Sequence, residues 1–204
     1  MEVPAEPTVS PLSVVEDGVE LGAGVIVWDH ACIREDACLG SGSTVGRGAF
    51  IDVAVVIGSN CKIQNNAMIY TPARLSDGVF VGPAAILTND RWPRAVGLDG
   101  HRIGPTGWTR QGIVVEEGAS IGAGSTIVAG VRLGKWSMVG AGAIVTKDVE
   151  PFSLVVGVPA RQVGWVGRAG SRLVTFDPDR GEYACSRTND RYQLTESGME
   201  LLDG

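Results

Sequence analysis

Aliphatic residues recur at every sixth position along most of this chain. The first run holds thirteen of them, from Val15 to Leu87, and the second holds six, from Val115 to Val145. A helix requires a period near 3.6 and a half-buried strand a period near 2, so a period of six fits neither as one continuous element. It predicts short strands, each with a large and a small inward residue, joined by corners where Gly or Asn adopts positive φ.

Three such units form one triangular coil of 18 residues, and nineteen units give about six coils. At a strand spacing of roughly 4.8 Å, the prism is on the order of 25–30 Å tall. Each coil buries its aliphatic residues only against its neighbours, so the array is stable as a whole. We therefore expect an all-β, parallel β-helix over residues 13–164, with a flexible N-terminus over residues 1–12.

The repeat is interrupted once and stops before the C-terminus. Leu87 and Val115 are 28 residues apart, of which one unit accounts for six, so 22 residues are inserted. The inserted stretch is rich in Trp and Arg and predicts a functional loop extruded over residues 89–112; the alternative is a tolerated insertion. Residues 165–204 predict short antiparallel strands that cover the open C-terminal end of the prism.

Composition excludes several other classes of protein. The formal net charge is −6 and there is no basic stripe, which argues against nucleic-acid binding. No apolar run approaches the roughly 20 residues of a membrane span, and the first residues lack the features of a signal peptide. None of the four cysteines forms a C-x-x-C pair. We expect a cytoplasmic protein whose reduced thiols mostly fill small core positions and which binds no metal.

Residues 18 apart should stack along one edge of the prism, and across the insertion the offset becomes 40. One edge then carries Trp28-Asp29-His30 and, two coils above, Gln64-Asn65-Asn66. Higher on that edge follows a strip of small residues, which exposes backbone N–H and C=O groups and suits a long thin ligand such as a pantetheine arm. The alternative is that small residues merely make tight corners. The candidate cofactor contacts on this strip are Gly82, Ala84, Gly122, Gly124, Gly140, Ala141 and Gly142.

A second edge carries Tyr70, then Asn89 and Asp90 at the mouth of the loop, and Lys147 near its end. In a trimer, one edge of a subunit can face a different edge of its neighbour. Residues 64–66 and the pair Asn89-Asp90 are therefore natural partners across an intersubunit cleft.

The repeated motif [LIV]-G-x-x-[STAV]-x resembles the hexapeptide-repeat acyltransferases over roughly residues 13–160. That resemblance implies left-handed coils, although the general rule for parallel crossovers predicts the right hand. It also implies a homotrimer with active sites between subunits. The strings V-T-K-D-V (145–149) and V-G-V-P-A-R (156–161) resemble the closing signature of the CoA-dependent members. They imply acetyl-CoA as co-substrate, with Lys147 and Arg161 at the CoA phosphates.

Three further strings narrow the resemblance: K-I-Q-N-N-A (62–67), G-P-A-A-I-L-T-N-D-R-W-P-R-A (82–95) and V-G-V-P-A-R-Q-V-G-W-V (156–166). Together they resemble N-acetyltransferases that act on UDP- or dTDP-linked 3-amino sugars in surface polysaccharide or glycoside biosynthesis. Arg91 and Arg94 would then contact the diphosphate of the sugar nucleotide. The substrate-binding residues that we expect are Gln64, Asn65, Tyr70, Arg91, Arg94 and His30.

The chemistry requires a neutral amine nucleophile, an oriented thioester and stabilisation of the tetrahedral oxyanion. A sugar amine is less basic than lysine, so a strong general base is not demanded. Asp90 would orient the amine and take its proton, and Asn89 would position it by a hydrogen bond. Asn66, Gln64 or a backbone N–H beside Gly82 would serve the oxyanion.

Two other functions remain open. A hexapeptide O-acetyltransferase would use a histidine base, because a hydroxyl needs deprotonation more than an amine does. The chain has two histidines, His30 and His101, the second in the loop. Many relatives carry His-rich strings after the first-coil tryptophan, where this chain has Trp28-Asp29-His30. A carbonic anhydrase of this shape needs three histidines for zinc, which excludes it. A non-catalytic β-helix subunit is the third function class.

Overall fold

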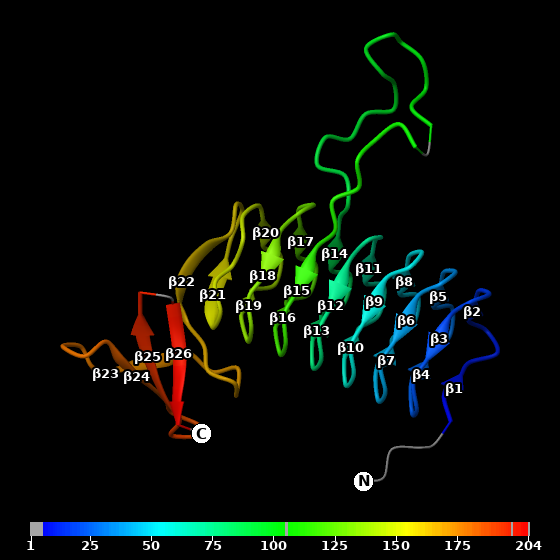
Figure 1. The fold of residues 1–204 in the computed structure, drawn as a ribbon. Helices are drawn as coiled ribbons and strands as arrows, with labels where there is room; N and C mark the ends of the chain where they lie inside the picture. The colour runs from blue at the N-terminus through cyan, green and yellow to red at the C-terminus, as the bar shows by residue number, and fades with distance from the viewer. Residues whose placement is uncertain (1–5, 105, 197, 204) are drawn as a thin grey trace.

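The computed structural model describes residues 6–104, 106–196 and 198–203 and is all-β throughout them (Figure 1). Short parallel strands stack into three faces of a prism. Face A contains β1 (Thr8–Val9), β4 (Ile26–Val27), β7 (Thr44–Val45), β10 (Lys62–Ile63), β13 (Phe80–Val81), β16 (Ser120–Ile121), β19 (Met138–Val139), β21 (Ser153–Val156) and β22 (Arg161–Trp165). Face B contains β2 (Val14–Val15), β5 (Cys32–Ile33), β8 (Phe50–Ile51), β11 (Met68–Ile69), β14 (Ile86–Leu87), β17 (Thr126–Ile127) and β20 (Ile144–Val145). Face C contains β3 (Glu20–Leu21), β6 (Cys38–Leu39), β9 (Val56–Ile57), β12 (Arg74–Leu75), β15 (Val114–Val115) and β18 (Arg132–Leu133).

Strand pairing confirms both of the offsets that the repeat predicts, within a run of coils and across the insertion. Lys62 pairs with Phe80 on face A, its counterpart in the next coil. Across the insertion, Ile86 pairs with Thr126, so the register of the coils is unchanged. The inserted residues between β14 and β15 leave the prism as a single long loop (Figure 1).

The prism is longer than the six coils that the aliphatic count predicts. Face A has nine strands, of which only the last, β22, is antiparallel, so eight successive turns contribute to it. The first coil begins at Thr8, inside the stretch that we expected to be a flexible N-terminus; residues 1–5 of that stretch lie outside the described residues. The last turn pairs Met138 with Leu154, a shorter offset than in the other coils, so counting by six misses it.

The core consists of the inward residues of all three faces. Large residues such as Ile63 and Ile127 and their small partners such as Ala67 are fully buried. Burying each large aliphatic side chain contributes about 1.5–3 kcal/mol. The four cysteines are free thiols; Cys61 and Cys185 are buried. Cys32 and Cys38 are half-buried at outward strand positions, so the prediction that cysteines fill the core is correct for two of the four.

The C-terminal segment forms a separate antiparallel sheet at the end of the prism opposite to β1 (Figure 1). Its strands are β23 (Leu173–Asp177), β24 (Glu182–Cys185), β25 (Arg191–Thr195) and β26 (Gly198–Asp203). The ring of Tyr192 meets that of Phe152 edge-on, with centroids 5.4 Å apart, which joins the sheet to the last corner of the prism. Within the described residues, no helix is long and apolar enough to cross a membrane.

Candidate functional site

The corners between face A and face B, called the first corner, stack as the sequence predicts. From Gly48 to Gly142, the N–H of the third corner residue donates to the carbonyl of the middle residue one coil earlier. Asn66 donates to Arg47 (2.9 Å), Gly124 to Pro83 (2.8 Å) and Gly142 to Ala123 (2.8 Å). The polar triplet at residues 64–66 therefore does have the strip of small residues above it.

Glycine is favoured at the positions of the strip for two different structural reasons. A Cβ on Gly122 would lie 2.4 Å from the backbone N of Ala141, and one on Gly82 would lie 2.6 Å from that of Ala123. These first-position glycines are required by the spacing of the coils. Gly124 and Gly142 have φ of +64° and +68°, and a Cβ on either would have no atom within 4 Å. Only the third positions therefore open onto free space.

Gly140, Ala84 and Ala141 complete the strip. A Cβ on Gly140 would lie 2.7 Å from Cγ1 of Val156, so this glycine also belongs to the close-packed set. Ala84 is exposed with φ of 55°, and Ala141 is exposed at a middle position.

Backbone N–H groups at the middle corner positions lack partners in the coil stack. In one coil a side chain supplies the missing acceptor: Oδ1 of Asn65 accepts a hydrogen bond from the backbone N–H of Arg47 at 3.0 Å. In the upper coils the corresponding residues are Ala123 and Ala141, whose neighbours offer no such acceptor. Across the described residues neither of these two exposed N–H groups has a hydrogen-bond partner. An unpartnered donor is satisfied by water or by a ligand carbonyl, and the open third positions leave room for the ligand.

Asn66 and His30 occupy the third corner positions of their coils, with φ of 57° and 59°. Non-glycine residues rarely adopt this left-handed region, and Asn and His do so more readily than most. Each side chain is exposed. The backbone thus gives Asn66 a structural reason to be Asn, in addition to the oxyanion role that we expect.

Gln64 and Asn65 line a cavity of about 280 Å³ on the face A side of the first corner. Trp28 and Arg47 also line this cavity, and Trp28 is 53% exposed. Neither Trp28 nor Arg47 was assigned to the site from sequence, although the stacked column of the repeat places both beneath Gln64. We call this cavity the Trp28 hollow.

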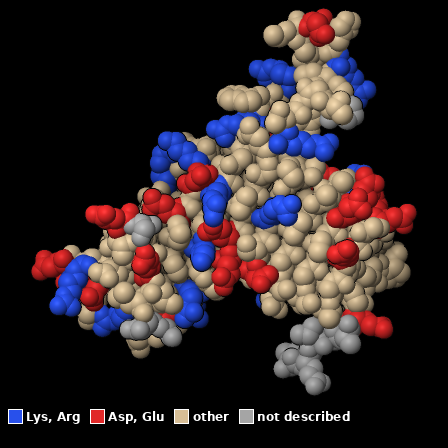
Figure 2. Space-filling view, viewed as in Figure 1, with Lys and Arg blue, Asp and Glu red and all other residues tan. Residues whose placement is uncertain are grey.

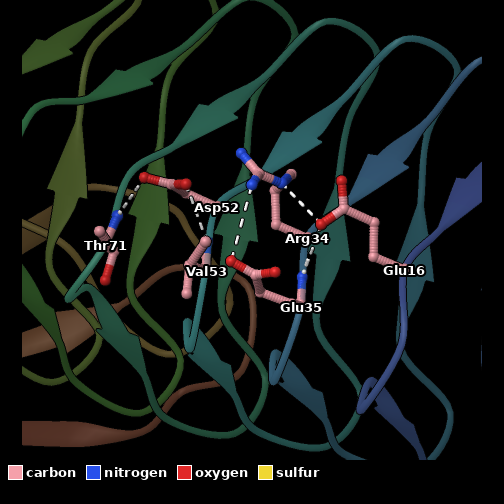
Figure 3. A network of polar contacts seen from close by, with 6 residues as sticks. All are labelled: Glu16, Arg34, Glu35, Asp52, Val53 and Thr71. Carbon is pink, nitrogen blue, oxygen red and sulfur yellow. Dashed lines mark hydrogen bonds and ion pairs between the residues drawn. The ribbon is translucent and has the colours of Figure 1, made fainter.

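The corners between face B and face C, called the second corner, carry a ladder of polar contacts (Figure 3). Near its start, Nε of Arg34 donates to Glu16 at 2.7 Å. This hydrogen bond, together with the N–H of Glu35, lowers the pKa of Glu16. Higher up, Oδ2 of Asp52 accepts the N–H of Thr71 at 3.2 Å. The ladder holds successive corners in register.

Asn89 stands at the top of this ladder. Its Nδ2 donates to the carbonyl of Thr71 at 2.7 Å, and its own carbonyl accepts the N–H of Gln111 at 2.9 Å. Both ends of the inserted loop are therefore fixed through Asn89. No described residue donates to its side-chain oxygen, which can therefore accept from a donor such as an amine.

Asp90 lies one residue further, half-buried at the loop mouth, and its Oδ1 accepts the N–H of Trp92 at 2.9 Å. Arg91 donates to the carbonyl of Ala129 at 3.2 Å, and Arg94 to that of Pro93 at 2.9 Å. Asp90, Arg91 and Arg94 all line one cavity of about 330 Å³ inside the loop. The structure thus brings these three predicted residues together.

The loop concentrates positive charge on an acidic chain. It contains four arginines and two aspartates, a net charge of +2 against −6 for the whole protein. In Figure 2, Lys and Arg atoms flank the base of the projecting loop, while Asp and Glu lie at the N-terminal end of the prism, over its middle and near its C-terminal end. The net positive charge of the loop favours an anionic ligand beside it.

Tyr70 lies on the second corner one coil below Thr88, whereas Lys147 and Arg161 lie at the last coil. The ring of Tyr70 packs on Phe50 with centroids 5.6 Å apart. Lys147 and Arg161 are exposed and line one cavity of about 270 Å³ at the last coil, together with the carboxylates of Asp148 and Glu150. The predicted pairing of the two cations near one ligand is therefore sterically allowed.

Within one chain the two polar corners do not meet. Ala84 on the first corner and Thr88 on the second are separated by a strand of face B, which spans roughly 13 Å at about 3.3 Å per residue. Residues 64–66 and the pair Asn89-Asp90 thus contribute to different edges. No group of three or more His, Cys, Asp or Glu is placed to hold a metal ion among the described residues.

Comparison with known proteins gives one match to a family profile. The profile, described as the hexapeptide repeat of succinyl-transferase, matches residues 33–71 and 112–147. Among solved structures, the acetyltransferase domain of PglB from Neisseria gonorrhoeae in complex with acetyl coenzyme A aligns with a TM-score of 0.50 and 18% identity, over 78% of this chain and 58% of that one. At this identity the likeness concerns the fold alone.

Three curated relatives are similar in sequence. The bifunctional protein GlmU of Thermotoga maritima is 36% identical over 76% of this chain, which spans only 30% of that protein. Serine acetyltransferase of Bacillus subtilis is 32% identical over 79% of this chain and 64% of its own length. The dTDP-3-amino-3,6-dideoxy-alpha-D-galactopyranose 3-N-acetyltransferase of Aneurinibacillus thermoaerophilus is 39% identical over 44% of each chain. The matched repeat and the fold show that the chain is built from hexapeptide repeats, and the proteins to which it is similar include acetyltransferases.

Proposed function

We propose that this protein is an acetyl-CoA-dependent N-acetyltransferase that acetylates the amine of a UDP- or dTDP-linked amino sugar. The observation that carries the donor half is the pair of unpartnered backbone N–H groups at Ala123 and Ala141. They lie beside the open third positions of the strip. A pantetheine arm has two amide carbonyls and a thin apolar chain, so it matches donors spaced one coil apart, about 4.8 Å.

The end of the strip supports the same donor. Val156 lies directly above Gly140, and the hairpin that follows leads to Arg161, which shares a cavity with Lys147. Lys147 belongs to the second corner, and together with Arg161 it would contact the phosphates of CoA beyond the last coil, beside Asp148 and Glu150. Gly124 and Gly142 would lie against the arm itself.

The acceptor half is supported by the charge of the loop and by one relative. The N-acetyltransferase of Aneurinibacillus thermoaerophilus, to which this chain is similar, is named for a dTDP-linked 3-amino sugar. A sugar nucleotide is an anion, and the loop places Arg91 and Arg94 in one cavity with Asp90. Gln64, Asn65, Tyr70 and His30 would complete the acceptor contacts.

In the reaction the sugar amine attacks the thioester carbonyl of acetyl-CoA, and a C–N bond forms. The tetrahedral intermediate collapses as the C–S bond breaks, and CoA leaves as a thiolate. Asp90 would accept the proton that the nitrogen loses, and the free side-chain oxygen of Asn89 would orient the amine. Asn66 would donate to the oxyanion.

Two corners that lie on different edges require a neighbouring subunit to complete one site, so we propose a homotrimer. Apolar side chains face outward along face B: Val14 is 54% exposed and Met68 39% exposed, with Phe50 and Ile86 half-buried between successive coils. Burying such a column against another copy would shield it from water and bring the second corner of one subunit to the first corner of the next.

The experiment is acetyl transfer measured by mass spectrometry of the acceptor, with acetyl-CoA and a panel of nucleotide-linked amino sugars. Asp90→Asn should lower kcat at least a hundredfold and flatten its pH dependence, since the carboxylate that accepts the proton is gone. If the kcat of Asp90→Asn equals that of wild type at every pH, Asp90 does not accept the proton.

O-acetylation is the second candidate, favoured by the similarity to serine acetyltransferase. His101 is exposed in the loop, where its backbone N–H donates to Oδ1 of Asp99 at 3.0 Å. If His101→Ala abolishes transfer to a hydroxyl acceptor while Asp90→Asn does not, the protein is an O-acetyltransferase. A structural subunit would bind no acetyl-CoA at all.

A further inference from the structure

The Trp28 hollow lies below the strip, and the acetyl donor does not use it. It is a notch between coils: Trp28 and Gln64 are first-corner residues two coils apart, roughly 9.6 Å along the prism. The coil between them contributes Gly46, which has no side chain to fill the space. A Cβ on Gly46 would lie 2.6 Å from Oδ1 and 2.7 Å from N of Asn65, so the notch is kept open by the packing of the coils.

Two of the side chains around this notch, those of Trp28 and Arg47, have no partner among the described residues. Trp28 is 53% exposed, and its ring makes no aromatic or cation–π contact among the described residues. Arg47 has its backbone N–H held by Asn65, but its exposed guanidinium forms no ion pair or hydrogen bond within the described part of the chain. The carboxylate of Asp29 is half-buried and fixed by the hydroxyl of Ser10. A ring and a cation are therefore presented to solvent around one empty space.

An exposed indole beside a free guanidinium recognises a flat aromatic group that carries phosphate. The cavity of about 280 Å³ has room for a nucleobase stacked on the exposed face of Trp28. Gln64 offers both a donor and an acceptor to the edge of a pyrimidine, and guanidinium binds phosphate oxygens through two parallel hydrogen bonds.

We infer that the Trp28 hollow is the nucleotide subsite of the acceptor: Trp28 stacks on the base, Gln64 reads its edge and Arg47 binds the diphosphate. The inference rests on the proposed function for its link to an amino sugar. It changes the phosphate contacts expected from sequence, because Arg47 belongs to the same corner as Gln64, whereas Arg91 and Arg94 belong to the loop on the second corner.

The test measures binding of free UDP and free dTDP by calorimetry, without any transfer reaction. Trp28→Ala and Arg47→Ala should each weaken nucleotide binding at least tenfold, because one loses the stack and the other the phosphate contact. Trp28→Phe, which retains a ring, should restore most of the affinity. The affinity for acetyl-CoA should stay within twofold of wild type in all three variants.

Arg74→Ala is the matched control, since Arg74 is an exposed cation at an outward position on face C. It should leave nucleotide binding unchanged. Nucleotide affinity that is unaffected by Trp28→Ala and Arg47→Ala, or wild-type protein that binds neither nucleotide, overturns the inference. Nucleotide binding that depends on Trp28 with no acetylation of any amino sugar would instead keep the subsite and refute the proposed function.

Discussion

The two classes of glycine on the first corner predict opposite consequences for the same substitution. In Gly122→Ala the new methyl would lie 2.4 Å from the N of Ala141 and 2.7 Å from the O of Val139, at least 0.7 Å inside ordinary contact of about 3.4 Å. Both obstacles are backbone atoms of the next coil and cannot rotate away. Overpacking of this kind costs about 1–3 kcal/mol, and the rigid neighbours place Gly122→Ala at the upper end.

Gly124→Ala, two residues further on, has no atom within 4 Å of its methyl group. Its cost is therefore only that of a non-glycine residue at φ of +64°, roughly 1 kcal/mol. The methyl would instead occupy the open space where the pantetheine arm is proposed to lie. We expect Gly124→Ala to fold nearly as well as wild type and to bind acetyl-CoA at least tenfold more weakly.

Chemical denaturation followed by circular dichroism measures the first effect, and calorimetry with acetyl-CoA measures the second. The free energy of unfolding of Gly122→Ala should fall by about 2 kcal/mol more than that of Gly124→Ala. Equal losses of stability, or unimpaired acetyl-CoA binding by Gly124→Ala, would refute the division of the strip into packing and ligand-facing positions.

Four other variants test the loop anchor, the Glu16 ion pair and the proposed contacts to the CoA phosphates. Asn89→Ala removes the 2.7 Å hydrogen bond to the carbonyl of Thr71 and should cost about 1 kcal/mol at the loop base. Trypsin should then cleave the loop faster while the melting temperature changes little; an unchanged cleavage rate would contradict the anchoring role. The pKa of Glu16 is lowered in the folded protein, so its stabilisation is present above the ordinary carboxyl pKa and is lost as pH falls through the folded value. The melting temperature of Glu16→Gln should thus lie below wild type at neutral pH and converge with it in acid, and a constant gap would show that the ion pair is not responsible. Lys147→Ala and Arg161→Ala should each raise KM for acetyl-CoA about fivefold with kcat unchanged, which is roughly 1 kcal/mol for an exposed charged contact; an unaltered KM would place the phosphates elsewhere.

Most of the prism follows from the sequence because one period governs both burial and strand register. The offset predicted across the insertion is correct at Ile86 and Thr126 because the loop leaves and re-enters at the same corner. The period fails where packing no longer requires a coil of full length. The last turn, with Met138 against Leu154, is shorter than the others. At the other end the period still holds, since Val9 of β1 lies six residues before Val15, but the count of aliphatic residues began at Val15.

The site was harder to predict because its residues serve the backbone as well as any ligand. Asn66 adopts the positive φ that its corner requires, and the side chain of Asn65 accepts the backbone N–H of Arg47. The presence of Asn at these positions therefore does not by itself indicate a catalytic or binding role. Gly82 and Gly122 look the same in sequence as Gly124, yet only the last faces open space. These differences depend on the distance between coils, which composition does not encode.

The most direct test of the central claim is mass spectrometry of the acceptor after incubation with acetyl-CoA and the UDP- and dTDP-linked 3-amino sugars. We expect one acetyl group on the sugar nitrogen, formed in step with CoA release, and no acetylation when the amine is replaced by a hydroxyl. Acetylation of the hydroxyl analogue at an equal or higher rate, or CoA release without an acetylated amine, would contradict the central claim.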